Sequence, residues 1–295
     1  MSDFYLAHEY WFAAAQLVLA MLGMGATLTL ADFRRVFADP QGFGVGMVLQ
    51  LLVAPALAWV FIDLFGVGPG LAVGLAVCAA VPGGTVSNVF TYFAQGHIAL
   101  SIALTAVATV ACLITTPLIL DLLVSHHMPA GFDMPSGRIA VEIGATLLLP
   151  LILGMLYLRA LPASAATFSK WCIRGSLFVI GLIVIGALTA GRLDLESFGL
   201  VNVGYVFGFV LALAAVSYGV PRLMGLSSSD VTAINVEVTV RNTNLGLLIK
   251  ASLFPAVVGT SDPVGDNTLF AILLYGALML LLSAALIPWH RRRNA

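Results

Sequence analysis

Long apolar runs, separated by glycine, proline and charged residues, cover most of this chain. A helix needs about 20 mostly apolar residues to cross the hydrocarbon core of a bilayer, and the runs reach that length. They predict nine spans: Trp11–Leu30, Gly42–Leu64, Gly70–Ala94, His97–Val124, Ile139–Leu158, Trp171–Ala190, Phe198–Val220, Ser228–Phe254 and Leu269–Trp289. The pattern therefore indicates an all-α polytopic membrane protein with nine transmembrane helices.

The composition supports this interpretation and excludes several partners. Of the 295 residues, 60% are hydrophobic and 9% are charged, whereas soluble domains carry about 25% charged residues. We expect a single membrane domain over residues 1–295, with the lipid bilayer as its surroundings. The net charge is −1 and no basic stripe is present, so we expect no nucleic-acid partner. No feature indicates an obligate protein partner.

The lysine and arginine residues predict an orientation, because short cytoplasmic loops are enriched in them. If the C-terminal arginines Arg291–Arg293 are cytoplasmic, six other basic residues fall on the same side: Arg34, Arg35, Arg159, Lys170, Arg174 and Arg222. Only Arg138 and Arg192 fall on the opposite side. We therefore expect a multi-pass protein of the cell inner (plasma) membrane, with its N-terminus outside. Lys250 lies near the outer end of its span, where we expect its side chain to extend to the interface.

A weak internal repeat relates the two halves of the chain. Residues Gly23–Phe33 end the first span, and the similar segment Ile185–Asp194 ends the sixth. This alignment pairs spans two to four with spans seven to nine, and the two copies enter the membrane from opposite sides. We expect an inverted repeat, with four helices in residues 9–125 and five in residues 138–290. Inverted repeats are typical of secondary transporters.

Two spans carry polar interruptions at corresponding places in the two halves. The third contains Pro82, Gly83 and Gly84, which weaken a helix because proline lacks a backbone donor and glycine is flexible. The eighth contains Glu237, about 15 Å from the start of its helix and so near the membrane centre. A charge there costs about 2.5–3.5 kcal/mol. Paired interruptions of this kind indicate a transport site.

The chemistry expected at such breaks follows from the ends of the half-helices. Free carbonyls at a C-terminal end suit a cation, and free N–H groups at an N-terminal end suit an anion. The hard oxygen ligands that Na⁺ prefers are available from Ser87, Asn88, Thr105 and Glu237. The half-helices that begin near Thr85 and Asn242 would face an anionic substrate group. We expect no other metal and no organic cofactor.

At these residues the chain resembles the bile acid:sodium symporter family. The shared motifs are Pro82–Asn88, Ala99–Thr105, Glu237 with Val238 and Asn242, Gly23–Gly25, and Gln50 before Pro55. The resemblance implies a core domain, in which two broken helices cross, and a panel domain. Some members have ten helices and others nine, and this chain is similar to a nine-helix form without the first helix. The fifth span, unpaired in the repeat, is then explained.

The resemblance also implies two sodium sites. The first would use five side chains: Ser87, Asn88, Ser101, Thr105 and Glu237. The second would use Gln50, Glu237, the backbone of Val238 and Val240, and a glutamine at position 241. This chain has Arg241 there. Because a guanidinium stays charged and repels Na⁺, we hypothesise that Arg241 replaces the second ion. In a variant of this hypothesis, Arg241 turns toward the cavity and binds a substrate carboxylate.

Structural alternatives stay open for several of these residues. Glu237 and Arg241 are four apart, so they could form an ion pair within one helix. Ser101 and Thr105 could bond to carbonyls of their own helix, and Gln50 could link two helices. Tyr275 could line the substrate cavity or make an aromatic contact.

The combined interpretation is a symporter that moves an organic anion together with Na⁺ by alternating access. The substrate would be a bile-acid-like steroid or a small carboxylate such as pantoate or pyruvate. A carrier that is independent of Na⁺ or coupled to H⁺, and a membrane sensor without transport, are the alternatives. An enzyme is not expected, because the chain contains no HExxH motif, no GxSG motif and no facing pair of intramembrane aspartates.

Overall fold

The computed structural model describes residues 2–34, 40–125 and 134–294. These residues are almost wholly helical and contain no β-strand. Six helices within them are long and apolar enough to cross a membrane: Pro40–Phe65, Ile98–Val124, Ser136–Ala160, Pro162–Thr189, Leu200–Leu223 and Pro263–Asn294. The protein is therefore a multi-pass membrane protein.

Two of the six long helices contain a π-helical turn. The helix Pro40–Phe65 consists of α3 (Pro40–Val48), η2 (Leu49–Val53) and α4 (Ala54–Phe65). The helix Ser136–Ala160 consists of α8 (Ser136–Ile143), η4 (Gly144–Leu148) and α9 (Leu149–Ala160). The other four are α7 (Ile98–Val124), α10 (Pro162–Thr189), α12 (Leu200–Leu223) and α15 (Pro263–Asn294).

The remaining predicted spans are also helical, but each differs from a simple long apolar helix. The first is α1 (Ser2–Gly25), which carries buried Glu9 and Gln16. The third is split into α5 (Pro69–Ala80) and α6 (Thr85–Phe93), and the eighth into α13 (Ser228–Thr239) and α14 (Thr243–Leu253). Both predicted breaks therefore occur, one at residues 81–84 and the other at residues 240–242.

Several helix ends differ from the predicted spans. Helix α1 begins at Ser2 rather than Trp11, and α10 begins at Pro162 rather than Trp171. Hydropathy marks only the apolar part of a helix, whereas backbone hydrogen bonding continues into the polar interface. The predicted end of the first span, Leu30, belongs to a separate short helix, α2 (Leu30–Arg34). At the start of α2, Asp32 Oδ2 accepts hydrogen bonds from the amide and hydroxyl of Thr29 at 2.8 and 2.7 Å, as the acid of a capping box does.

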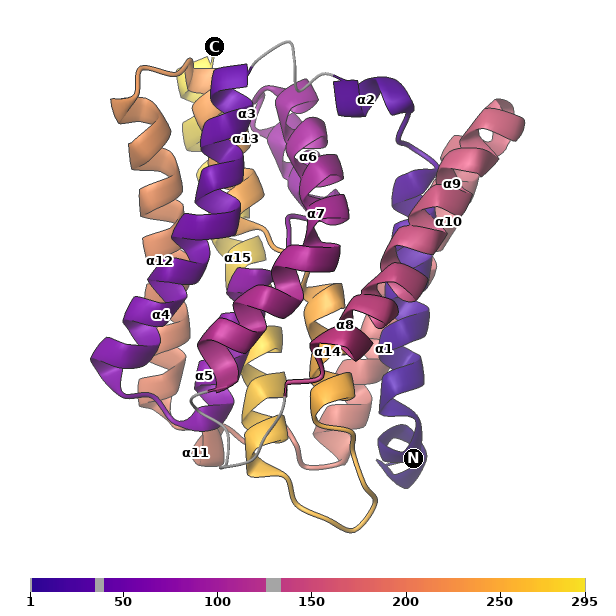
Figure 1. The fold of residues 1–295 in the computed structure, drawn as a ribbon, viewed down its shortest axis with the longest axis vertical. Coiled ribbons are helices and arrows are strands. Elements are labelled where there is room, and N and C mark those ends of the chain that lie inside the picture. Colours follow the sequence, from indigo (N-terminus) through magenta and orange to yellow (C-terminus); the bar gives the residue numbers. More distant parts are fainter. Residues whose placement is uncertain (1, 35–39, 126–133, 295) are drawn as a thin grey trace.

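The long helices form two packed groups, which stand apart toward the C-terminal end in Figure 1 and meet toward the other end, where α14 packs on α1 and α8 on α7. The side group consists of α1, the continuous helix α8–α9, and α10, and α1 packs against both of the others. Helix α1 approaches α9 closely, since a Cβ on Gly25 would lie 2.1 Å from the Leu151 carbonyl oxygen, and one on Gly154 2.4 Å from that of Leu22. Small residues allow such contact between membrane helices.

The main group contains the two broken helices together with α3–α4, α7, α12 and α15. Almost all of α5 is buried, because α4, α7 and α15 pack around it. The two breaks meet inside this group. The amide of Asn242 donates to the Pro82 carbonyl at 2.8 Å, and Gly83 and Arg241 form an isolated antiparallel bridge. Each break therefore supplies part of the backbone hydrogen bonding that the other lacks.

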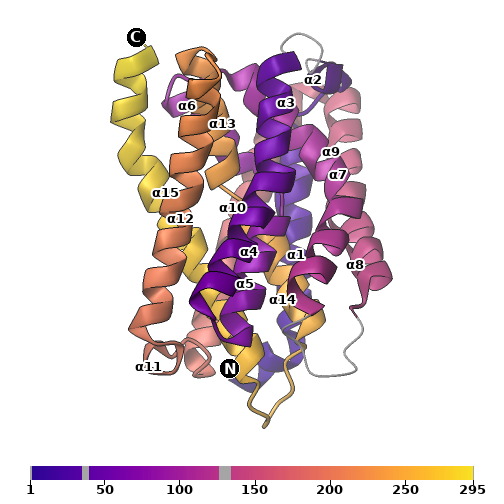
Figure 2. The ribbon, with the colours of Figure 1, turned by 60° about the vertical axis from the view of Figure 1, so that its left-hand side comes forward.

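The two chain ends lie at opposite ends of the molecule, as Figures 1 and 2 show. Helix α2 and the end of α12 lie at the same end as the C-terminus in Figure 1, which groups Arg34 and Arg222 with Arg291–Arg293. Arg35, which the sequence also assigned to that side, lies outside the described residues.

Candidate functional site

Glu237 occupies the last turn of α13 beside the crossing breaks, and no part of it is exposed. Its Oε2 accepts a hydrogen bond from Ser87 Oγ at 2.6 Å, and its Oε1 accepts one from Thr105 Oγ1 at 2.5 Å. Ser87 is on α6 and Thr105 is on α7, so three helices meet at this carboxylate.

Ser101 and Asn88 complete this cluster. Ser101 Oγ lies 2.7 Å from Asn88 Oδ1 and 3.1 Å from Glu237 Oε2, and Thr105 Oγ1 lies 3.3 Å from Asn88 Oδ1. Thr105 also contacts the Ser101 carbonyl of its own helix at 3.0 Å, so the expected back-bond coexists with the contact to Glu237. The structure thus brings together all five residues of the predicted first sodium site. They present hydroxyl, amide and carboxylate oxygens, the donors that a hard cation prefers.

Gly83 lies between Glu237 and Gln50. Its amide donates to Gln50 Oε1 at 3.1 Å. A Cβ at Gly83 would lie 2.0 Å from Glu237 Oε1, whereas one at Gly84 would make only ordinary contacts with Asn242 at 3.5 Å or more. Glycine at position 83 therefore gives the carboxylate its place in the break. The Gln50 side chain thus links η2 to the break between α5 and α6, a contact between two spans of the kind that the alternative for Gln50 described.

Arg241 lies in the second break and is 2% exposed. Its guanidinium donates to the Val81 carbonyl at 3.0 Å through Nη1 and approaches the Gln50 carbonyl at 3.5 Å through Nη2. In a continuous helix the Asn242 amide would bond to the Val238 carbonyl, but here it bonds to Pro82. The cationic group thus lies among backbone carbonyls beside Gln50, close to the predicted second ion site.

The alternative of an ion pair between Glu237 and Arg241 is wrong for this structure. Helix α13 ends at Thr239, so the four-residue helical spacing does not extend to Arg241. No ion pair within the described part of the chain joins the two side chains.

A small cavity of about 120 Å³ lies between the two helix groups at the breaks. Thr85, Arg241 and Asn242 line its main-group side, and residues of α1 and α10, among them Ala20, line the other. Thr85 is the first residue of α6 and Asn242 caps α14, with its Oδ1 accepting from the Leu245 amide at 3.3 Å. The Nδ2 group of Asn242 and Nε of Arg241 are buried and have no acceptor among the described residues.

Tyr275 does not line this cavity, in contrast to its suggested role in substrate binding. The residue is fully buried, and its hydroxyl donates to the Thr239 carbonyl at 2.8 Å. Its ring packs near Phe209 of α12. Tyr275 therefore supports the end of α13 from within the main group, which agrees with the alternative of an aromatic contact.

The expectation for Lys250 is wrong, because its side chain does not reach the interface. Lys250 is fully buried, and its Nζ lies 2.7 Å from Oε1 of Glu9. Arg192 contacts the same carboxylate at 3.0 Å and also pairs with Asp266. Sequence reasoning missed this cluster. The available signal was acidic residues near the outer ends of the first and last spans, but nothing in the sequence pairs positions so far apart.

A comparison with protein-family models supplies the decisive observation. The model of the sodium bile acid symporter family matches residues 14–195, which is more than half of the chain. The chain belongs to this family. Members of the sodium bile acid symporter family are transporters, not enzymes.

Curated relatives of this chain come from plants, bacteria and animals. A probable chloroplastic sodium/metabolite cotransporter, BASS1 of Arabidopsis thaliana, is 29% identical over 81% of this chain and 58% of the relative. The uncharacterized sodium-dependent transporter YocS of Bacillus subtilis is 28% identical over 80% of this chain and 72% of the relative. The ileal sodium/bile acid cotransporter of Oryctolagus cuniculus is 26% identical over 81% and 69%. The chain spans between 55% and 58% of the length of three plant relatives that it matches.

Proposed function

We propose that this protein is a secondary transporter that moves an organic anion across the membrane together with Na⁺. The observation that carries the proposal is the convergence of Ser87, Asn88, Ser101 and Thr105 on the buried carboxylate of Glu237. A buried carboxylate surrounded by neutral oxygens suits a monovalent cation that must bind and then leave. The relatives whose names include sodium cotransport support the choice of ion.

The transport geometry follows from the two helix groups. The side group corresponds to the panel domain and the main group to the core domain, with the breaks and their cavity at the boundary. The crossing breaks support the inverted repeat of residues 9–125 and 138–290, with nine spans over a single transport domain. Helices α1 and α10 then correspond to each other, as do α7 and α15. Alternating access requires these two bodies to move relative to each other.

The substrate that we propose is a small organic carboxylate. The free donors of Asn242 and Arg241, with the N-termini of α6 and α14, offer hydrogen bonds to an anion at one wall of the cavity. A cavity of about 120 Å³ is smaller than the roughly 300–1,000 Å³ of pockets for drug-sized ligands. A bile-acid-like steroid would therefore need this cavity to widen.

Arg241 determines the ion count in this proposal. Its guanidinium contacts the Val81 carbonyl and lies beside Gln50, so it supplies the positive charge that a second Na⁺ would bring. The second site, formed by Gln50, Glu237, Val238 and Val240, is then replaced by a fixed cation. Coupling to a single Na⁺ follows.

Substrate counterflow in proteoliposomes tests the function. We expect exchange of a labelled small carboxylate that depends on Na⁺ with a Hill coefficient near one. Exchange that does not change with Na⁺ would contradict sodium coupling, and absence of exchange for every organic anion tested would contradict transport.

The variant Arg241→Gln tests the ion count separately. Because it restores the glutamine that the family resemblance places at this position, we expect the Hill coefficient to rise toward two. A coefficient near two in the unaltered protein would refute the replacement of the second ion. In that case the remaining proposed role of Arg241 would be to bind the substrate carboxylate.

A further inference from the structure

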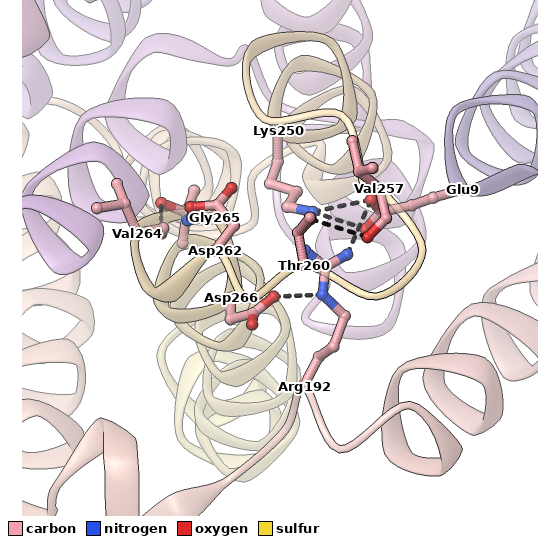
Figure 3. A network of polar contacts seen from close by, with 10 residues as sticks. Glu9, Arg192, Lys250, Val257, Thr260, Asp262, Val264, Gly265 and Asp266 are labelled. Atoms are coloured by element: carbon pink, nitrogen blue, oxygen red, sulfur yellow. Dashed lines mark hydrogen bonds and ion pairs between the residues drawn. The ribbon is translucent and has the colours of Figure 1, made fainter. Parts of the chain in front are cut away.

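Four charged side chains, of which three are buried and Asp266 is partly exposed, form a cluster far from the ion and substrate residues. Glu9 comes from α1, Arg192 from the segment after α10, Lys250 from α14 and Asp266 from the first turn of α15. Figure 3 shows Lys250 and Arg192 reaching the carboxylate of Glu9 from different elements, with Asp266 on the far side of Arg192. We call these four residues the charge cluster.

The contacts that Glu9 makes within the charge cluster are short and shielded from water. Lys250 Nζ lies 2.7 and 2.9 Å from the two oxygens of Glu9, and Arg192 Nη1 lies 3.0 Å from Glu9 Oε2. Arg192 Nε also pairs with Asp266. Lys250 is fully buried and Glu9 is 5% exposed. Such contacts hold a protein together only while all partners are present, because a single charge left behind in a buried site is costly.

The charge cluster joins the side group to the main group. Glu9 belongs to the side group, and Arg192 is held to the end of α10 by a hydrogen bond from its amide to the Ala187 carbonyl at 2.9 Å. Lys250 and Asp266 belong to helices of the main group. Two of its ion pairs, Glu9 with Lys250 and Arg192 with Asp266, therefore cross the boundary, and the third lies within the side group. If the groups separate, each surface keeps one positive and one negative charge. Neither surface then carries a net charge when water enters.

The position of the charge cluster relates it to the cavity. Both lie at the boundary between the two groups, and α1 contributes to both through Glu9 and Ala20. These residues are eleven apart, so the charge cluster lies about 16 Å along the helix toward the N-terminal end of the molecule. It therefore lies between the cavity and that end, along the boundary of the two groups.

We propose that the charge cluster is an ionic gate, closed in this structure, that must open for substrate to pass between the cavity and the N-terminal side of the membrane. The inference rests on the proposed transport by movement of the two groups. Charged pairs suit a contact that opens repeatedly, because water hydrates the separated charges, whereas separated apolar surfaces would be exposed at a cost.

The test measures access to the cavity rather than transport. Ala20→Cys is introduced after Cys78, Cys112 and Cys172 have been replaced by alanine. A membrane-impermeant thiol reagent is then added to vesicles on the face that carries the N-terminus. We expect slow labelling of this parent chain. Adding Glu9→Gln with Lys250→Met, which removes both charges of one crossing pair, should raise the labelling rate by roughly tenfold.

The chain offers a matched control in Arg138 and Glu142. Their ion pair at 2.9 Å lies within α8 and joins no two groups, so Arg138→Gln with Glu142→Gln should leave labelling unchanged. Unchanged labelling in the folded Glu9→Gln, Lys250→Met protein would overturn the gate. So would an equal rise in the control.

A second variant, Arg192→Gln with Asp266→Asn, repeats the test on the other crossing pair. We expect the same rise in the labelling rate. If the first variant does not fold, the labelling rate of this second variant decides whether the charge cluster is a gate. If neither variant gives a monodisperse protein, the charge cluster is a structural support and the gate is overturned. Counterflow of the unaltered protein separates the two proposals. If its counterflow is normal and the variants show unchanged labelling, the gate alone is refuted. If its counterflow is absent although labelling of the variants rises, transport is refuted.

Discussion

At the scale of single residues, the surroundings of Glu237 explain how a carboxylate persists at membrane depth. A buried charge is costly unless other groups compensate for it. Ser87 and Thr105 direct hydroxyls at its two oxygens, and Ser101 lies within reach of Oε2. These dipoles compensate for only part of the charge, so the same carboxylate retains an attraction for a cation.

Thr105→Val tests this arrangement. The change keeps the shape of the side chain but removes the hydroxyl that contacts Glu237 Oε1 at 2.5 Å. We expect Na⁺ affinity to fall by about tenfold or more, because the change removes one of the oxygen ligands of the proposed ion site. The shift of the melting temperature with Na⁺ concentration measures the affinity.

Thr109→Val is the control for that change. Thr109 lies one turn further along α7 and is equally buried, but its hydroxyl has no partner among the described residues. The stabilisation by Na⁺ should match that of the unaltered protein. An equal loss in the two variants would assign the effect to the packing of α7 and not to a ligand at Glu237.

The sequence predicted four of the five oxygen-bearing residues because proline, glycine and an intramembrane carboxylate are rare and local signals, whereas Ser101 was predicted only through the family resemblance. It could not predict the contacts of Arg241. Those depend on where the chain goes after Thr239, and a helical spacing assumed through the break placed the guanidinium beside Glu237. The same limit applies to Tyr275, whose hydroxyl bonds to a carbonyl that exists as a free acceptor only because α13 ends there.

At the scale of the elements, two proline residues explain the π-helical turns. Pro55 follows η2 and Pro150 follows η4, each as the second residue of the next α-helix. Proline cannot donate to the carbonyl four residues earlier, and a wider turn makes room for its ring. In the first case the wide turn contains Gln50, whose side chain accepts from Gly83. An irregular helix therefore supports the neighbouring broken one.

Gly154→Ala tests the close packing of α1 against α9. A Cβ at Gly154 would lie 2.4 Å from the Leu22 carbonyl oxygen, so the two helices must move apart. We expect a loss of about 1–3 kcal/mol, the usual cost of overpacking. The melting temperature in detergent should fall accordingly.

Gly181→Ala provides the comparison, because a Cβ there meets nothing within 4 Å. Gly181 lies within α10, where alanine favours the helix by about 0.5–1 kcal/mol. The melting temperature should stay the same or rise. A similar fall in both variants would show that the approach of α1 to α9 does not limit stability.

At the scale of the whole molecule, the basic residues and the positions of the chain ends predict one orientation. The two ends lie on opposite sides of the molecule, and the basic C-terminal segment Arg291–Arg293 lies at the same end as α2. We expect the C-terminus in the cytoplasm. A fluorescent protein that matures only in the cytoplasm should fluoresce when fused to the C-terminus. Fluorescence from the same reporter at the N-terminus would contradict the orientation.

The charge cluster shows what sequence patterns leave out at this scale. Glu9 and Lys250 are 241 positions apart, and each looks like an ordinary polar residue near a helix end. Lys250 was expected at the interface because hydropathy describes a span as if it stood alone in lipid. Its partner comes from another helix group, so only the packed molecule makes the buried position favourable.

The reciprocal hydrogen bonding of the two breaks has a consequence for biosynthesis. The ribosome delivers the break at residues 81–84 to the membrane well before Asn242, whose amide pairs with the Pro82 carbonyl, has been made. Until then the first half carries an open backbone in the bilayer, and Ser87 lacks the carboxylate that it later contacts. Neither half of the chain therefore contains the complete site. It forms only when the last third of the chain has been inserted, and a truncated product would lack it however well its own helices insert.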